Sequence, residues 1–376
     1  MNRRFHVVFA AVLIVSLTAA AKSRADVLGK TTQGRLNLRS IDVISFAPEG
    51  VLLIGDGTGA QVFAVKTADS HTKQQLEGKI GDIRSKLAAR VGTTPDGIEI
   101  IDLAVHPTSG LAYVAVRRQD GKQYIVLTVD GRGSIDEFAL DDVTFARLAL
   151  KTESSAKVDK VTDVAWADDR IIAAGRSNES FSSKIFSVEA PLIHDAANAS
   201  FSAETYHVSH KRWETKAPMS VVIPLKEDGR MWVVGAFSCT PIVKYPIDDL
   251  KPGSAVRGSS MIELGSGNRP LDMFVYEKDG QPFVLSNTFR FHHARRPFGP
   301  SPYWTVKFEQ GLLGGTDRTN DDAQRRLSDG FEPVTDRIQL VEAFHGVVHM
   351  DRLGDAHALV IRQTDKDFDL EALPLP

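Results

Sequence analysis

Four aspartates stand at matching places in four similar segments of the sequence, and their type and spacing could do chemistry. Asp42, Asp102, Asp163 and Asp272 each begin a short apolar run, while Ser220 and Val347 take the same place in two further segments. The six positions lie 60, 61, 57, 52 and 75 residues apart. If the runs are strands of a repeated unit, their equivalent side chains share one face. Carboxylates gathered in this way can hold a hard cation or exchange protons with a substrate.

A purely structural role explains the same aspartates. An aspartate at the start of a strand often caps the adjacent turn by accepting hydrogen bonds from its backbone N–H groups. A repeated capping role would place the residue at the same point of every unit. The sequence leaves the binding role and the capping role open.

The segments that carry these positions share one plan, which is a strand, a turn rich in Gly, Asp or Pro, and a second strand. They begin at Ile41, Ile101, Val161, Pro218, Pro270 and Gly346. Third strands are predicted over 61–65, 124–129, 184–188 and 242–245. The repeat predicts an all-β protein, a β-propeller of six blades with seven as the alternative. Residues 34–41 are expected to complete the last blade and so close the ring.

Two of these segments carry a resemblance to known proteins. VHPTSGLAYVAV from Val105 and YEKDGQPFVLSN from Tyr276 are similar to the repeats of the YVTN, NHL and SMP-30-like propellers, a broad group of exported proteins. The resemblance covers most of the chain and implies a propeller fold. Such propellers include enzymes, ligand-binding proteins and partner scaffolds, so the resemblance selects no function.

Two regions depart from the repeat. Apolar residues recur at helical spacing over 72–91, at Leu76, Ile80, Ile83, Leu87 and Val91, and predict an amphipathic helix inserted between the first two blades. The stretch 289–337 is rich in Gly, Pro, Arg and Asp and predicts a long irregular insertion.

The predicted blades bring further polar residues to one face. In an antiparallel blade, the turn between the second and third strands returns to the face where the first strand begins, which places Arg117, Arg176, Arg290 and His292 around the aspartates. Asn268 and Arg269 precede Asp272 and join the same face. His349 is expected close to the acidic ring, where it is a candidate base. A satisfied interior histidine and a solvated surface of arginines are the structural alternatives.

Composition and the N-terminus limit the classes of function. The formal net charge of -3 excludes nucleic-acid binding through bulk positive charge, and the single Cys239 excludes a disulfide framework or a Cys-rich zinc site. Arg3 and Arg4 precede an apolar run that ends in small residues, which predicts a signal peptide over 1–25. We therefore expect residues 26–376 to form one exported propeller domain, soluble in the periplasm or outside the cell.

Three functions fit these observations. The first is a module that binds a small molecule or an exported protein partner on the Asp- and Arg-lined face, and the sequence favours it because no nucleophile–base motif or metal motif is present. The second is a Ca²⁺-assisted lactonase or esterase, with Asp102, Asp163, Asp272 and Asn268 as ligands and His349 as base. The third is an accessory subunit of an exported redox enzyme.

Overall fold

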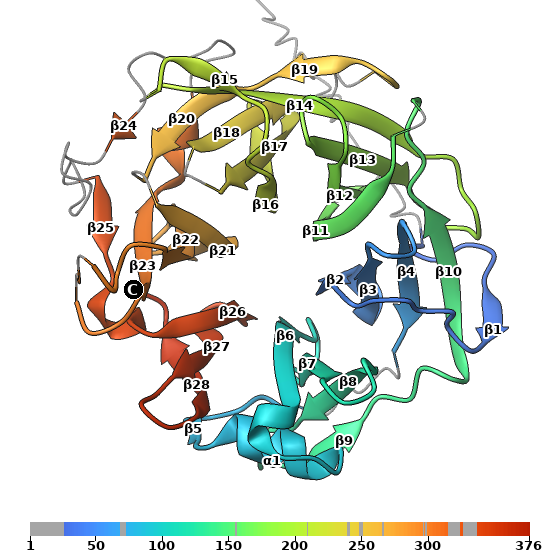
Figure 1. Cartoon of the computed structure of the whole chain (residues 1–376), viewed down its shortest axis with the longest axis vertical. Helices are drawn as coiled ribbons and strands as arrows, with labels where there is room; N and C mark the ends of the chain where they lie inside the picture. Colours follow the sequence, from blue (N-terminus) through green and yellow to red (C-terminus); the bar gives the residue numbers. More distant parts are fainter. Residues whose placement is uncertain are drawn as a thin grey trace, which may run out of the picture.

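Short β-hairpins with apolar, β-branched strands build the whole molecule, in agreement with the repeat in the sequence. The computed structural model describes residues 26–67, 73–154, 156–208, 210–238, 241–247, 251–264, 267–295, 297, 299–314, 324–325 and 337–376. The strands form six sheets arranged around a central opening (Figure 1). The chain is therefore a six-bladed β-propeller. The predicted signal peptide and Cys239 lie outside the described residues.

Blades are numbered here by the order in which their innermost strands occur in the chain. Blade I contains β2 (Val43–Ala47), β3 (Val51–Asp56), β4 (Gln61–Lys66), β10 (Val143–Ala149) and β1 (Thr32–Gly34). Blade II contains β6 (Ile98–Val105), β7 (Ala112–Arg118), β8 (Tyr124–Val129) and β9 (Ile135–Glu137). Blade III contains β11 (Val158–Ala167), β12 (Arg170–Ser177), β13 (Ser183–Glu189), β14 (Ala199–His207), β15 (Arg212–Glu214) and β19 (Ala255–Arg257).

The remaining blades follow the same pattern. Blade IV contains β16 (Met219–Glu227), β17 (Arg230–Phe237), β18 (Pro241–Pro246), β20 (Ser259–Glu263) and β24 (Gln324–Arg325). Blade V contains β21 (Asn268–Lys278), β22 (Gln281–Arg290), β23 (Tyr303–Glu309) and β25 (Ile338–Leu340). Blade VI contains β26 (Val347–Leu353), β27 (His357–Gln363), β28 (Phe368–Pro374) and β5 (Lys79–Ile80). The 3-10 helices are η1 (Pro48–Gly50), η2 (Pro95–Gly97), η3 (Gln310–Leu313) and η4 (Glu342–Phe344).

The blades do not follow the chain around the ring. The innermost strand of blade I contacts those of both blade II and blade III, and the innermost strand of blade II contacts that of blade VI. The order around the ring is therefore II, I, III, IV, V, VI (Figure 1). After β4 the chain builds blade II and then returns through β10, which pairs with β4 and completes blade I.

Apolar side chains fill the spaces between neighbouring blades. The buried residues form six clusters within the described part of the chain, and each joins two blades that are adjacent in the ring. Leu53 of blade I and Val164 of blade III share one cluster, while Ile54 and Ala115 join blades I and II in another. Burial of these faces holds the ring together, because each sheet covers the apolar face of the next.

Ring closure differs from the prediction that residues 34–41 complete the last blade, and that prediction is wrong. The first strand, β1, pairs with β10 inside blade I. The outermost strand of blade VI is instead β5, in which Ile80 pairs with Leu370 of β28. The reason is the order of the ring: blade VI lies beside blade II, so the segment that leads into blade II reaches it.

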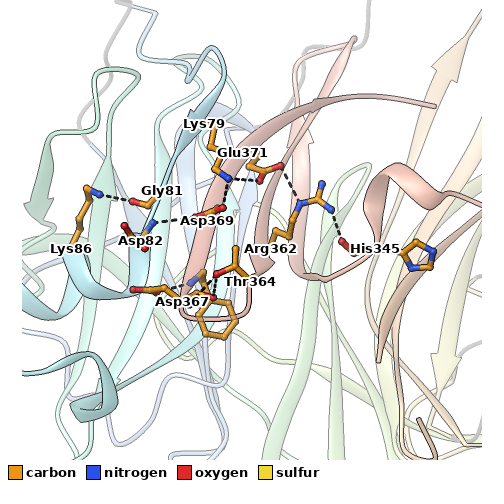
Figure 2. A network of polar contacts seen from close by, with 11 residues as sticks. Lys79, Gly81, Asp82, Lys86, His345, Arg362, Thr364, Asp367, Asp369 and Glu371 are labelled. Atoms are coloured by element: carbon orange, nitrogen blue, oxygen red, sulfur yellow. Dashed lines mark hydrogen bonds and ion pairs between the residues drawn. The ribbon is translucent and has the colours of Figure 1, made fainter. Parts of the chain in front are cut away.

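Polar contacts reinforce this closure (Figure 2). Asp369 accepts a hydrogen bond from the backbone N–H of Asp82 at 3.1 Å and forms an ion pair with Lys79. Asp367 accepts one from the backbone N–H of Ser85 at 3.2 Å. The insertion before blade II is thereby fastened to the last strand of the chain.

The helix and the irregular stretch predicted as insertions each cover fewer residues than the sequence predicts. The helix α1 covers Ile83–Arg90 only, because residues 79–80 pair as β5 and Gly78 takes a φ of 114°, which lies outside helical backbone. The stretch 289–337 is also not irregular throughout. It contains β23, where alternating apolar residues pair with β22, and the segments 315–323 and 326–336 lie outside the described residues.

Candidate functional site

The innermost strands of the six blades surround a central channel with a volume of about 1040 Å³. Asp42, Asp102, Asp163, Asp272 and His349 all line this channel. These side chains reach it because the innermost strand of each blade borders the channel. The structure thus brings the aspartates to one channel, as the repeat predicts.

A β-bulge occurs at each of these side chains except Asp42. Asp102 and Asp163 follow a break in register and lie opposite Ala115 and Ala174. His349 follows the same kind of break opposite Ile361. His349 therefore occupies the aspartate position of blade VI, and in blade IV that position belongs to Val221 rather than Ser220. The predicted equivalences of Ser220 and Val347 are wrong, because an extra residue in a bulge shifts the side-chain alternation.

Five channel aspartates each accept a backbone hydrogen bond from the neighbouring blade. The acceptor carboxylates and donor N–H groups are Asp102 and Ile44 (2.7 Å), Asp163 and Val222 (2.7 Å), Asp272 and Met350 (3.0 Å), Asp351 and Val105 (2.7 Å), and Asp42 and Val161 (3.1 Å). Asp42 also caps its own blade's turn through Gly57. The carboxylates therefore fasten blade to blade, which extends the capping role expected from the sequence.

Three of these side chains also converge on one point. Asp102, Asp272 and His349 each offer a ligand atom, and these atoms lie within 4.8 Å of one another. Nδ1 of His349 is 3.6 Å from Oδ1 of Asp102. This nitrogen is buried and has no hydrogen-bond partner among the described residues. We call Asp102, Asp272 and His349 the channel triad.

Burial and mutual repulsion raise the pKa values of the carboxylates around the triad. Burial, with the nearby charges of Asp102 and Asp272, raises the pKa of Asp163 to about 8. Burial and the charge of Asp102 raise the pKa of Asp272 to about 7, although the imidazolium of His349 opposes the shift. Burial likewise raises the pKa of Asp351 to about 6. Burial lowers the pKa of His349, but the two triad carboxylates outweigh it and the net shift is upward.

These shifts predict that the protein loses stability as the pH rises from about 4 to about 8 in the presence of a chelator. A carboxyl group with a raised pKa binds its proton more tightly in the folded state than in the unfolded chain. Its stabilisation is complete below the unfolded pKa of about 3.8 and is lost as the pH rises through the folded value. The melting temperature measured at pH 5 should therefore exceed that at pH 8.

The variant Asp163→Asn isolates this effect. It removes the carboxyl with the pKa of about 8, so the melting temperature should fall less steeply with pH than in the wild type. Asp168→Asn alters an exposed aspartate in the turn after the same strand and should leave the slope unchanged. Equal slopes for all three proteins would contradict the assignment.

Several residues predicted at the site lie elsewhere. Asn268 is buried and accepts a hydrogen bond from Nε1 of Trp304 at 3.2 Å, so its side-chain oxygen is directed away from the channel triad. Arg290 is also buried, with its guanidinium over the ring of Trp304. His292 is exposed and does not line the channel. On β21 itself, Asn268 precedes the break in register that contains Asp272.

Three of the four arginines predicted around the aspartates line the channel, and they are Arg117, Arg176 and Arg269. Arg117 forms an ion pair with Glu99, the residue opposite it on β6. Arg176 binds Asp159 through two hydrogen bonds of 2.8 and 3.1 Å.

Other polar residues of the channel wall were not predicted from the sequence, among them Tyr124, Lys160, Tyr303 and Asp351. The last of these follows His349 by two positions on the same strand, so strand alternation alone could have found it. The tyrosines had no sequence signal, since both come from third strands, β8 and β23, whose ends meet the channel only in the folded ring.

No family model and no curated protein matches the sequence. Solved structures give distant likenesses that span most of the chain. An endo-arabinase from Bacteroides thetaiotaomicron is 11% identical with a TM-score of 0.40, over 82% of this chain and 98% of its own. The allergen Mala s 1 from Malassezia sympodialis is 9% identical with a TM-score of 0.38, over 92% and 96%.

A third likeness is a structure described as the Dos1 propeller, 8% identical with a TM-score of 0.36 over 88% of this chain and 69% of that one. At such values no function transfers, and the fold is established by the six sheets of this chain. Among the described residues, no helix has the length and apolar character required to cross a membrane. The chain is a β-propeller whose channel carries a buried cluster of carboxylates around one histidine.

Proposed function

We propose that the protein is a binding module whose channel holds a divalent cation on Asp102, Asp272 and His349 and, next to it, a small molecule. The observation that carries this proposal is the convergence of the three ligand atoms within 4.8 Å. Ligand atoms on one ion lie up to about 4.2 Å apart, twice a bond length of about 2.1 Å. Small side-chain rotations are enough to close the triad on an ion.

The charges around the triad support a cation. Asp163 and Asp351 add their carboxylates to those of Asp102 and Asp272, and both have raised pKa values because burial disfavours their charged forms. An ion of charge +2 would relieve this repulsion, which protons alone relieve only at lower pH. The backbone N–H groups that bind the carboxylates hold them in place before any ion arrives.

The donor set favours a metal that accepts nitrogen. The sequence suggests Ca²⁺ bound by oxygen ligands only. In the structure, however, the side-chain oxygen of Asn268 accepts a hydrogen bond from Trp304, and the third member of the triad is a histidine. An imidazole with two carboxylates suits Zn²⁺ or Mn²⁺ better than Ca²⁺, which prefers six to eight oxygens. Such an ion would supply a positive centre for oxygen atoms of a ligand in the channel, while the carboxylates and His349 fix its position.

Calorimetric titration tests the proposal directly. Protein dialysed against a chelator and then freed of it is titrated with ZnCl₂, MnCl₂ or CaCl₂ at pH 7.5. We expect one ion per chain, with Zn²⁺ or Mn²⁺ at least about tenfold tighter than Ca²⁺. The bound ion should also raise the melting temperature, because it binds only the folded ring. If none of the three ions binds stoichiometrically or changes the melting temperature, the proposal fails.

Hydrolysis without a metal is a second candidate, favoured by the pairing of His349 with Asp102 inside the channel. The two carboxylates beside His349 raise its pKa and so favour its protonated form, which suits a general acid better than the base expected from the sequence. Turnover of lactones or aryl esters that persists in chelator and is lost in His349→Gln would support this role. Turnover that the variant retains would exclude it.

A further inference from the structure

One arginine at the channel mouth differs from the others in its partners. Arg117 and Arg176 are each paired with a carboxylate of their own blade. Arg269 lines the same channel and is exposed, yet within the described residues its guanidinium has neither a hydrogen bond nor an ion pair. Its hydrogen-bond donors therefore remain available.

Aromatic rings hold this arginine in place. Its guanidinium carbon lies 5.6 Å from the ring centre of Phe289 and 5.8 Å from that of Phe291. Phe289 is directly opposite Arg269 in the pairing of β21 with β22, and its ring also contacts Tyr303 of the channel wall. Stacking on rings restricts the side chain while leaving the N–H groups at the edge of the guanidinium free to bind an anion.

The surroundings of Arg269 indicate what kind of ligand it would meet. The other candidate cation, Lys160, lines the channel on β11 of blade III, where it interacts with Asp42. Phe291 is 48% exposed and is one of only two large exposed apolar side chains in the described part of the chain. A ligand beside Arg269 would therefore meet an unpaired guanidinium and an uncovered aromatic ring together.

We propose that Arg269 binds the anionic group of a small organic anion, a carboxylate or a phosphate, whose apolar body covers Phe291. This inference rests on the proposed function only in taking the channel as a ligand site, and it names the class of that ligand. Arg117 and Arg176 also line the channel, but each is already paired with a carboxylate. Arg269 is then the residue that determines specificity for an anion.

Saturation-transfer NMR and calorimetry with four probes test the inference, using the full chain with and without added Zn²⁺. The probes are benzoate, phenyl phosphate, inorganic phosphate and the neutral benzyl alcohol. We expect benzoate or phenyl phosphate to bind and benzyl alcohol not to bind, and the stronger of the two anions identifies the anionic group. Inorganic phosphate should bind more weakly than phenyl phosphate, because it cannot cover Phe291.

Variants assign the binding to Arg269. Arg269→Gln should weaken the better aryl anion about tenfold or more, the loss expected for a charged hydrogen-bonding partner. Arg269→Lys should recover part of it, since lysine keeps the charge without the planar guanidinium. Arg230→Gln is the matched control: Arg230 also lies over an aromatic ring, that of Trp232, but does not line the channel. It should bind the probe as the wild type does.

The outcomes separate this inference from the proposed cation site. Arg269→Gln should bind Zn²⁺ as the wild type does, so loss of the anion with retained metal binding supports the role of Arg269. If neither aryl anion binds the wild type, or if Arg269→Gln binds it as tightly as Arg230→Gln does, the inference is overturned. That result would leave the titration of the triad with metal ions unaffected.

Discussion

Leu87→Ala should lower the free energy of unfolding by about 3 kcal/mol, within the range for a leucine removed from a packed core. Leu87 is fully buried in α1 and shares its cluster with Leu370 of β28 and Leu103 of blade II. The helix therefore packs into the joint between the first residues of blade II and the end of the chain. Denaturant unfolding measures the loss.

The place where hydrogen exchange becomes faster in this variant distinguishes the joint from the rest of the core. The pairing of β5 with β28 covers only two residue pairs, and the ion pair of Lys79 with Asp369 is partly exposed, so these contacts alone contribute little. Without Leu87, hydrogen exchange should become faster first in β5 and β28. Leu148→Ala removes an equally buried leucine from blade I and should cost a similar free energy without that local change. A uniform loss of protection in Leu87→Ala would contradict the role of α1 as the closure.

Asp272→Asn should weaken cation binding about 100-fold or more, because it removes a charged ligand from the channel triad, and even outer-shell partners are worth 10- to 100-fold. The asparagine keeps a side-chain oxygen for the backbone N–H of Met350, so the contact between blades V and VI survives. The variant also removes a buried charge beside Asp102 and Asp163. In chelator at pH 8 its melting temperature should therefore exceed that of the wild type.

Asp42→Asn provides the matched control for this prediction. Asp42 also joins two blades through a backbone N–H group, that of Val161, but it interacts with Lys160 and Asp56 rather than with the triad. Calorimetric titration with Zn²⁺ should give wild-type affinity for Asp42→Asn and a large loss for Asp272→Asn. Equal affinities for the two variants would place the cation outside the triad.

The repeat in the sequence predicts most of the fold correctly, because hairpins depend on local turn chemistry and on alternating apolar residues. All six strand–turn–strand segments are present as the pairs β2–β3, β6–β7, β11–β12, β16–β17, β21–β22 and β26–β27. The convergence of Asp102, Asp163 and Asp272 on the channel also follows from their matching places in the repeat. His349 is found near them, as the sequence predicts. It occupies the position equivalent to the aspartates, however, and not the position two residues further along the strand.

The order of the blades and the closure of the ring depend on contacts between segments that are distant in the chain. The return of β10 to blade I and the pairing of β5 with β28 leave no local pattern in the sequence. Bulges are equally hard to read, since one extra residue reverses the side-chain alternation and moves Val221 and His349 into the ring.

The partners of single polar residues are likewise decided by the tertiary structure. Asn268 and Arg269 are adjacent in the sequence, yet one is buried on Trp304 and the other is exposed over two phenylalanine rings at the channel mouth. The sequence by itself determined a six-unit β repeat with carboxylates at equivalent places. Only the folded ring decided which of them meet His349, because that meeting requires blades II, V and VI to be packed around one channel.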